Sequence, residues 1–187
     1  RDPEMSRGLG DVYKRQTRNK ELLKYAQTDA LTGLYNKETT EQLTDELLSE
    51  DENKYHAFLI LDVDCFKQIN DIYGHAVGDI VLQKFGKLLK GTFREGDILG
   101  RIGGDEFGVI MKNIQTKDIA MKKAEELLAK TQAYKIDELK GNNISISIGI
   151  STAPQDGDCY MDLYKRADQA LYQAKRSGKA RVCNYFS

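Results

Sequence analysis

The chain has 187 residues, of which 40% are hydrophobic, and its 28 basic and 29 acidic side chains give a formal net charge of −1. This length and composition suit one compact domain, and the balanced charge excludes a global field that would draw the protein to nucleic-acid polymers or anionic lipid. Three cysteines without Cys-x-x-Cys spacing argue against a disulfide framework or a structural zinc site and fit a cytoplasmic location. No apolar run approaches the roughly 20 residues needed to cross a bilayer, so we expect no membrane insertion of this piece, although a longer parent protein could be membrane-anchored.

The first 28 residues differ in pattern from the rest of the chain. Residues 1–16 show no periodicity, and we interpret them as a non-native or disordered tail. Residues 17–28 are polar with a few leucines on one side, which predicts the end of a linker helix arriving from an upstream regulatory domain. The folded domain is then expected over residues 29–187, with Asp29 capping its first turn.

Alternating helical and strand periodicities follow along the domain. Helical spacing predicts helices over 37–50, 79–89, 117–131 and 161–177, and a helical or turn-like segment over 66–73. In this reading Gly74 and Gly78 bracket a loop, and Asp79 is the N-cap of the helix that follows. Strands are predicted over 56–64, 144–151 and 182–186, and the isoleucines of the second are expected to face the core while its small side chains face the other way.

Residues 97–111 are predicted to form a β-hairpin with the tip Gly103-Gly104-Asp105-Glu106. Glycine tolerates positive φ in a tight turn, and without a Cβ it lets a phosphate approach the backbone closely. A plain hairpin does not need two acids directly after two glycines. Adjacent carboxylates can hold a divalent cation or accept a proton, so the tip is a candidate active site.

A second acidic element ends the strand predicted over 56–64, where Asp62 and Asp64 should lie on one side by the period of two. The element order predicts an α+β fold with a central, mostly antiparallel sheet and helices packed around it. This architecture resembles the palm of polymerases and class III nucleotidyl cyclases.

The segments Arg101-Ile-Gly-Gly-Asp-Glu-Phe107 and Asp62-Val-Asp-Cys-Phe-Lys-Gln-Ile-Asn-Asp-Ile-Tyr-Gly-His-Ala-Val-Gly-Asp79 resemble the GGDEF domain of diguanylate cyclases. The similarity runs from about residue 29 to the end of the chain. It implies a cytoplasmic bacterial signalling enzyme that condenses two GTP into cyclic di-GMP and two pyrophosphates. The resemblance also implies a missing upstream sensory or receiver domain.

For catalysis, the resemblance implies two Mg²⁺ or Mn²⁺ ions per GTP site, held by Asp62, the Val63 carbonyl, Asp105 and Glu106. Hard oxygen ligands from separate elements suit such ions. Asp105 would assist deprotonation of the ribose 3′-hydroxyl, and which of Asp105 and Glu106 acts as the base stays open. The family pattern gives Asp64 no ligand role, so we expect it to be structural.

The phosphate contacts implied by the family fall on Lys67, which would neutralise triphosphate charge in the transition state, and on Lys175 and Lys179. The alternative for the last two is simply a favourable position near a helix C-terminus. Many relatives carry arginine where Lys179 stands, so a bidentate contact is replaced here by a point charge. Gly103 and Gly104 complete the expected substrate contacts.

Base choice is assigned to Asn70 and Asp79. A carboxylate can accept both N1–H and N2–H of guanine, whereas adenine offers no such donor pair, so GTP is favoured over ATP. A cyclase that makes adenine or mixed dinucleotides is the alternative this argument disfavours.

Arg94 and Asp97 match the Arg-x-x-Asp inhibitory site of the family, which binds the product. Because one domain holds one GTP and the product needs two bonds between two nucleotides, activity should require a homodimer. The main alternative is a catalytically silent receptor that binds cyclic di-GMP or GTP, and the intact tip argues against it.

Overall fold

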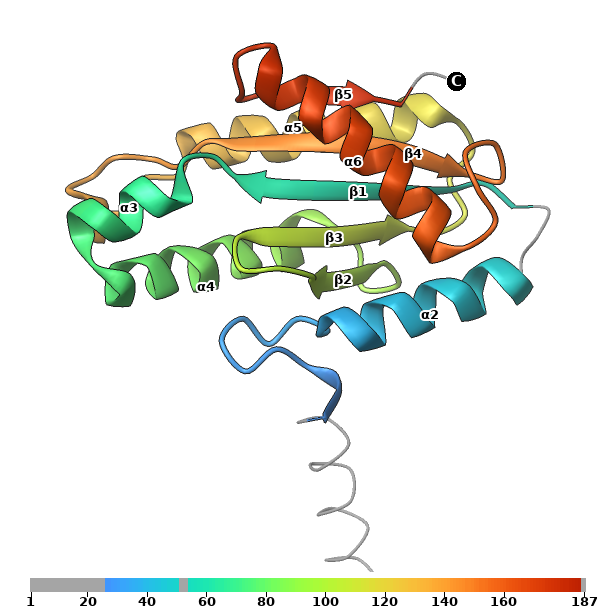
Figure 1. The fold of residues 1–187 in the computed structure, drawn as a ribbon, viewed down its shortest axis with the longest axis horizontal. Coiled ribbons are helices and arrows are strands. Elements are labelled where there is room, and N and C mark those ends of the chain that lie inside the picture. Colours follow the sequence, from blue (N-terminus) through green and yellow to red (C-terminus); the bar gives the residue numbers. More distant parts are fainter. Residues whose placement is uncertain (1–25, 51–53, 186–187) are drawn as a thin grey trace, which may run out of the picture.

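The computed structural model describes residues 26–50 and 54–185, where a five-stranded sheet has the order β2-β3-β1-β4-β5 (Figure 1). The strands are β1 His56–Val63, β2 Ile98–Arg101, β3 Glu106–Met111, β4 Ile146–Ala153 and β5 Val182–Asn184. All neighbouring pairs are antiparallel except β4 with β5. The predicted α+β class with a mostly antiparallel sheet is therefore confirmed.

Helices cover both faces of this sheet (Figure 1). They are α2 Lys37–Glu50, α3 Phe66–Tyr73, α4 His75–Thr92, α5 Lys117–Ala133 and α6 Tyr160–Arg176, with a 3₁₀ turn at Asp137–Leu139. One hydrophobic cluster joins the sheet to α4 and α5, and a second joins its other face to α2 and α6. The expectation for residues 1–16 lies outside the described residues, as does that for the linker helix over 17–28 up to residue 25; residues 26 and 27 are helical.

β1 is the central strand, and its apolar run is buried on both faces, as predicted. Phe58 and Ile60 pack in the α2 and α6 cluster, whereas Leu59 and Leu61 pack in the α4 and α5 cluster. A strand with no solvated face must be apolar throughout. Asp62 therefore marks the point where β1 approaches the edge of the core.

β4 lies two residues further along the chain than the predicted 144–151, and all eight of its residues are buried, the small ones on the opposite side from the isoleucines included. Ser151 donates a hydrogen bond to the Leu163 carbonyl at 2.8 Å, so its side of β4 faces α6. A Cβ on Gly149 would lie 2.1 Å from the Ala167 carbonyl oxygen and 2.4 Å from the Leu171 nitrogen. The small residues thus allow the α6 backbone to pack closely on the sheet.

The loop predicted between Gly74 and Gly78 is wrong. Gly74, with φ of 87°, ends α3, and α4 begins at the next residue, so Gly78 and Asp79 lie within the helix. Gly78 is buried against Asn70, whose Oδ1 lies 1.9 Å from the position a Cβ would occupy. The glycine makes room for a side chain, and Asp79 is not an N-cap.

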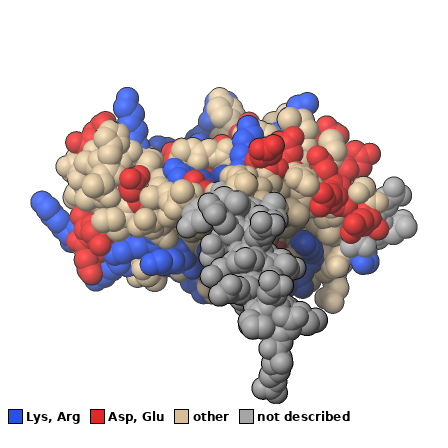
Figure 2. Space-filling view, turned by 90° about the horizontal axis from the view of Figure 1, so that it is seen from below, with Lys and Arg blue, Asp and Glu red and all other residues tan. Residues whose placement is uncertain are grey.

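Charge is segregated on the surface although the net charge is near zero. Figure 2 shows acidic side chains gathered over α2 and basic ones along the side formed by α4. Within the described part of the chain, none of the helices has the length and apolarity that crossing a membrane requires.

Candidate active site

The two acidic elements meet where β1 ends beside the hairpin. Antiparallel register places Asp62 directly opposite Glu106. One residue further on, the Val63 N–H donates a hydrogen bond to the Asp105 carbonyl oxygen at 3.2 Å. The sheet therefore brings together carboxylates that are more than forty residues apart in the sequence.

The acids perturb one another because they share a partly buried edge. Burial raises the pKa of Asp62, and the nearby charges of Asp105 and Asp64 raise it further. Burial likewise raises the pKa of Glu106, with Asp168 and Asp62 adding to the effect. Such a cluster favours protons or cations over free carboxylates.

Divalent cations fit this donor set. Hard carboxylate oxygens from β1 and from the hairpin tip are the ligands that Mg²⁺ and Mn²⁺ prefer. A cation already lies among them, because the Lys175 Nζ is 2.8 Å from Asp62 Oδ2. The ligand roles predicted for Asp62, the Val63 carbonyl, Asp105 and Glu106 stay predictions, but the acids stand where shared ions would need them.

A change at Glu106 tests the electrostatics of this edge without substrate or metal. In a chelator at pH 7, we expect Glu106→Gln to raise the free energy of unfolding, because the wild type must keep a partly buried carboxylate charged. As pH falls through the raised pKa toward the ordinary value of 4.5, the native wild type takes up a proton before the unfolded chain does. Wild-type stability then rises relative to the variant, so the difference in free energy of unfolding between Glu106→Gln and wild type becomes smaller. Urea unfolding at several pH values measures it.

Glu126 supplies a control of opposite sign. Hydrogen bonds from Lys123 and Lys130 lower its pKa to about 2, so its carboxylate stabilises the native state above the ordinary pKa, and this contribution is lost as pH falls. Glu126→Gln should therefore lower stability at pH 7, or leave it unchanged. If Glu106→Gln were destabilising at pH 7 in the chelator, our description of the acidic edge would be wrong.

The hairpin tip is tightly closed by its own backbone. The N–H groups of Ile102 and Gly103 both donate to the Glu106 carbonyl, at 2.9 and 3.1 Å. Neither Gly103 nor Gly104 has a positive φ, so the conformational reason expected for these glycines is wrong. A Cβ on Gly103 would lie 3.1 Å from Glu106 Cβ, whereas one on Gly104 would meet nothing within 4 Å. Gly104 thus leaves open space beside the tip.

A cavity of about 580 Å³ lies between α3, α4 and the tip. It collects five residues that the sequence assigned to substrate or catalysis, namely Lys67, Asn70, Asp79, Gly104 and Asp105. The helical position of Asp79 leaves its carboxylate free of the capping role. The remaining lining residues are Phe66, Asp71, His75, Leu82 and Arg101.

Arg101 is a site residue that the sequence reasoning missed. Its guanidinium donates to the Gly104 carbonyl from Nε at 3.1 Å and from Nη2 at 2.8 Å, and Nη1 is 3.1 Å from Asp29 Oδ1. Burial alone would raise the pKa of Asp29, but hydrogen bonds from Thr32 and the Arg101 charge lower it overall. Asp29 also caps its turn, as predicted, by accepting the Thr32 N–H at 2.8 Å.

α6 contributes two more unforeseen residues, Tyr164 and Asp168. The Tyr164 hydroxyl lies 3.4 Å from Glu106 Oε1, and burial followed by the charges of Glu106 and Asp168 raises the pKa of Tyr164 to about 12. With Lys175 they fall on one helical stripe, since each is three or four residues, or a sum of these, from the next. That spacing was the available signal.

Lys179 and Asp64 lie beside the cluster. The Lys179 Nζ is 3.1 Å from Cys65 Sγ, and this contact, with the charges of Asp64 and Asp62, raises the pKa of Lys179. Asp64 is buried and accepts hydrogen bonds from Ser145 Oγ at 2.6 Å, Ser147 Oγ at 2.7 Å and the Ala180 N–H at 3.1 Å. These contacts explain Asp64 as a structural residue, in line with the expectation.

Arg94 and Asp97 lie away from the acids, at the opposite end of β2. Asp97 is buried and accepts hydrogen bonds from Arg94 Nε at 3.0 Å and the Lys112 N–H at 3.1 Å, and Arg94 also contacts the Lys112 carbonyl. Arg94 itself has a side chain 59% exposed and lines two cavities, of about 430 and 540 Å³, one of which includes Lys123. Asp97 thus orients an exposed guanidinium.

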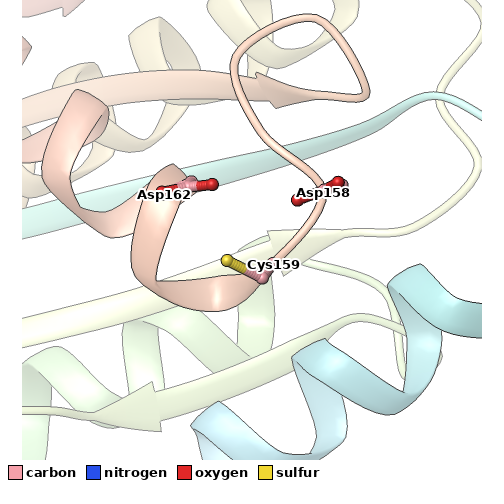
Figure 3. A group of neighbouring side chains, drawn as sticks. All are labelled: Asp158, Cys159 and Asp162. Atoms are coloured by element: carbon pink, nitrogen blue, oxygen red, sulfur yellow. The ribbon is translucent and has the colours of Figure 1, made fainter.

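A second group of possible metal ligands lies at the other end of the sheet (Figure 3). One side-chain atom each from Asp158, Cys159 and Asp162 lies within 4.8 Å of the others, at the start of α6. The adjoining end of β4 pairs with the start of β1, so the group is remote from Asp62. Exposed acids often cluster without an ion, and we assign this group no role.

The five-stranded sheet with helices on both faces has the palm-like fold of nucleotidyl cyclases. The chain belongs to the GGDEF family, because the family model described as "Diguanylate cyclase, GGDEF domain" matches residues 26–181. Diguanylate cyclase A of Treponema denticola is 37% identical over 170 residues, covering 88% of this chain and 46% of that protein. The chain thus spans less than half the length of this curated relative.

Solved structures agree with the family assignment. The GGDEF domain of TpbB from Pseudomonas aeruginosa superposes with a TM-score of 0.80 at 33% identity, covering 85% of this chain and 94% of that one. The GGDEF domain of DgcB from Caulobacter crescentus, solved in complex with c-di-GMP, gives a TM-score of 0.80 at 27% identity, covering 87% and 94%. Both the family and the fold predicted from the sequence are confirmed.

Proposed function

We propose that this chain is a diguanylate cyclase domain that condenses two GTP into cyclic di-GMP and two pyrophosphates. The observation that carries the proposal is the meeting of Asp62 with the intact tip acids Asp105 and Glu106 at one edge of the sheet. A silent receptor would have no need for a convergent set of hard oxygen ligands. Family membership and relatives named diguanylate cyclase support the same activity.

The residues of the chain divide the chemistry among them. Two Mg²⁺ or Mn²⁺ ions would be held by Asp62, the Val63 carbonyl, Asp105 and Glu106. When bound, such ions polarise the α-phosphate and lower the pKa of the attacking 3′-hydroxyl. Lys67, on the first turn of α3, would neutralise charge that develops on the triphosphate. Open space at Gly104 would let phosphate approach the tip backbone.

The cavity between α3, α4 and the tip suits the nucleoside. Asp79 would accept the N1–H and N2–H of guanine, and Asn70, held against Gly78, would contact its edge. Lys175 and Lys179 would bind the β- and γ-phosphates from the end of α6. One such site holds one GTP, so two domains must face each other, and the reaction should depend on a homodimer.

The hydrogen bonds by which Arg101 joins Asp29 to the Gly104 carbonyl predict a loss of turnover without loss of fold when they are broken. We expect Arg101→Lys to lower kcat by about 10- to 100-fold, because a point charge cannot bridge Asp29 and the Gly104 carbonyl, and a tip misplaced by about 1 Å costs rates of this size. Asp29→Asn should act in the same direction. Steady-state kinetics and circular dichroism measure both. Glu138→Gln is the control, because it breaks the distant Lys84–Glu138 ion pair, and it should change kcat by less than about twofold. Equal effects of all three variants on kcat would contradict the role given to the Asp29–Arg101–Gly104 hydrogen bonds.

Product inhibition is the second part of the proposal, and it rests on Arg94 and Asp97. Arg94→Ala should raise the inhibition constant for cyclic di-GMP at least about tenfold, because the exposed guanidinium supplies bidentate donors for phosphate or guanine. Lys112→Ala is a matched control, since only the Lys112 backbone contacts this pair. Inhibition curves with added product measure the effect. Equal inhibition of wild type and Arg94→Ala would remove the assignment.

The test of the function itself is turnover. Purified chain, brought together by a fused dimerising segment, should release pyrophosphate and cyclic di-GMP from GTP and Mg²⁺. If it binds cyclic di-GMP through Arg94 but makes no product even as a dimer, the receptor alternative is correct.

A further inference from the structure

Lys175 and Asp62 form an ion pair of 2.8 Å, with side chains 37% and 14% exposed. Under the proposed function, on which this inference rests, they have different partners, because Lys175 binds the triphosphate and Asp62 binds a metal ion. We propose that Lys175 is a tethered placeholder cation. It neutralises Asp62 while the site is empty, and it releases Asp62 when a divalent cation and a nucleotide bind.

The reach of Lys175 follows from how α6 is held. Gly149 lets the α6 backbone pack closely against β4, and Ala174 beside Lys175 is fully buried. The backbone of the last turn is therefore fixed near the acidic edge. The lysine side chain, a point charge on a flexible four-carbon stem, can turn between the acid and a phosphate without moving the helix.

Electrostatics explain why a placeholder is needed. Asp62 is close to the charges of Asp105 and Asp64, and Lys175 is the cation that pairs directly with Asp62 and counters them. The field of Lys175 also reaches Glu106, which faces Asp168 and Asp62. Partly buried carboxylates left without a cation would destabilise the native state.

The pair makes two binding events depend on each other. Asp62 Oδ2 cannot hold an ammonium group at 2.8 Å and present the same lone pair to a metal ion. Release of Asp62 frees Lys175, and a bound triphosphate keeps it occupied elsewhere. Metal and nucleotide should therefore bind with positive cooperativity that passes through this one side chain.

Lys179 is the matched control for charge alone. It lies near Asp64 and Asp62, but its ammonium contacts Cys65 Sγ at 3.1 Å and pairs with neither acid. Removing Lys179 deletes the same positive charge from the same edge without releasing Asp62. A general field effect would appear in both lysine variants, whereas competition for Asp62 would appear only at Lys175.

The experiment is a titration of Mn²⁺, followed by electron paramagnetic resonance, into nucleotide-free protein. We expect Lys175→Met to bind Mn²⁺ about five- to tenfold tighter than wild type, because the competing cation is gone. Lys179→Met and the charge-keeping Lys175→Arg should stay within about threefold of wild type. Equal changes for Lys175→Met and Lys179→Met, or weaker binding by Lys175→Met, would overturn the proposal.

Repeating the titration with a non-hydrolysable GTP analogue separates this proposal from the proposed function. The analogue should tighten Mn²⁺ binding to wild type at least about tenfold, and to Lys175→Met by clearly less. If the wild type binds Mn²⁺ with the analogue but Lys175→Met gives no gain in free protein, only the placeholder role is wrong. If the wild type binds no Mn²⁺ with the analogue present, the metal-dependent function is wrong as well.

Discussion

Asp105→Asn should reduce the rate of cyclic di-GMP formation by about 10³-fold or more, because an amide at the tip neither holds a divalent cation well nor accepts the proton of the 3′-hydroxyl. The expected result is loss of kcat with nucleotide binding largely retained, since the contacts of Asn70 and Asp79 lie on α3 and α4. Initial rates by chromatography of the products measure it.

The fold should survive this substitution. The structural contact of Asp105 with β1 is made by its backbone carbonyl, which accepts the Val63 N–H in the variant too. Glu125→Gln is the control for loss of one negative charge, because Glu125 is exposed on α5, away from the tip. An Asp105→Asn protein that turns over at the rate of the control would refute the role given to this carboxylate.

Asp79→Asn should lower kcat/KM for GTP by about 10²- to 10³-fold, because the amide presents one acceptor where guanine offers two donors. Inosine triphosphate, which lacks the exocyclic amino group, sharpens the test. The wild type should prefer GTP to this analogue, and the preference should shrink in the variant. Competition kinetics with the two nucleotides measure the difference.

Asp71 provides a neighbour for comparison. It lines the same cavity and is exposed, but no base-reading role is assigned to it. Asp71→Asn should change kcat/KM by less than about threefold. If Asp71→Asn and Asp79→Asn had equal effects, or if GTP and inosine triphosphate were equally good for wild type, guanine would be read by other groups.

Much of the fold was predictable because its elements have strong periodicities. The apolar run of β1 predicted a strand buried on both faces, and the helix over Lys37–Glu50 was placed with the bounds observed. The α3 to α4 connection was not, because Gly78 looked like a loop residue. A glycine is needed at position 78 because the Asn70 side chain fills the space that a Cβ would occupy. This contact belongs to tertiary packing, and no local sequence pattern predicts it.

The candidate site divides in the same way. Motif residues such as Asp62, Lys67 and Asp105 could be named from the resemblance to the GGDEF family, and the structure gathers them at one edge and one cavity. The bridge from Asp29 through Arg101 to the Gly104 carbonyl begins with a contact between residues 72 apart in the sequence, so it exists only through the fold. The ion pair of Lys175 with Asp62 could not be predicted from the sequence either, because it depends on how α6 packs against β1.

The most direct measurement of the central claim is a structure of the dimerised chain with a GTP analogue and Mn²⁺, using anomalous scattering to locate the metal. We predict metal peaks between the carboxylates of Asp62 and Asp105, with the triphosphate bridging them and guanine at Asp79. Clear density for the nucleotide with no metal between these two side chains would contradict the account, and the chain would then be a nucleotide-binding GGDEF domain without this catalytic centre.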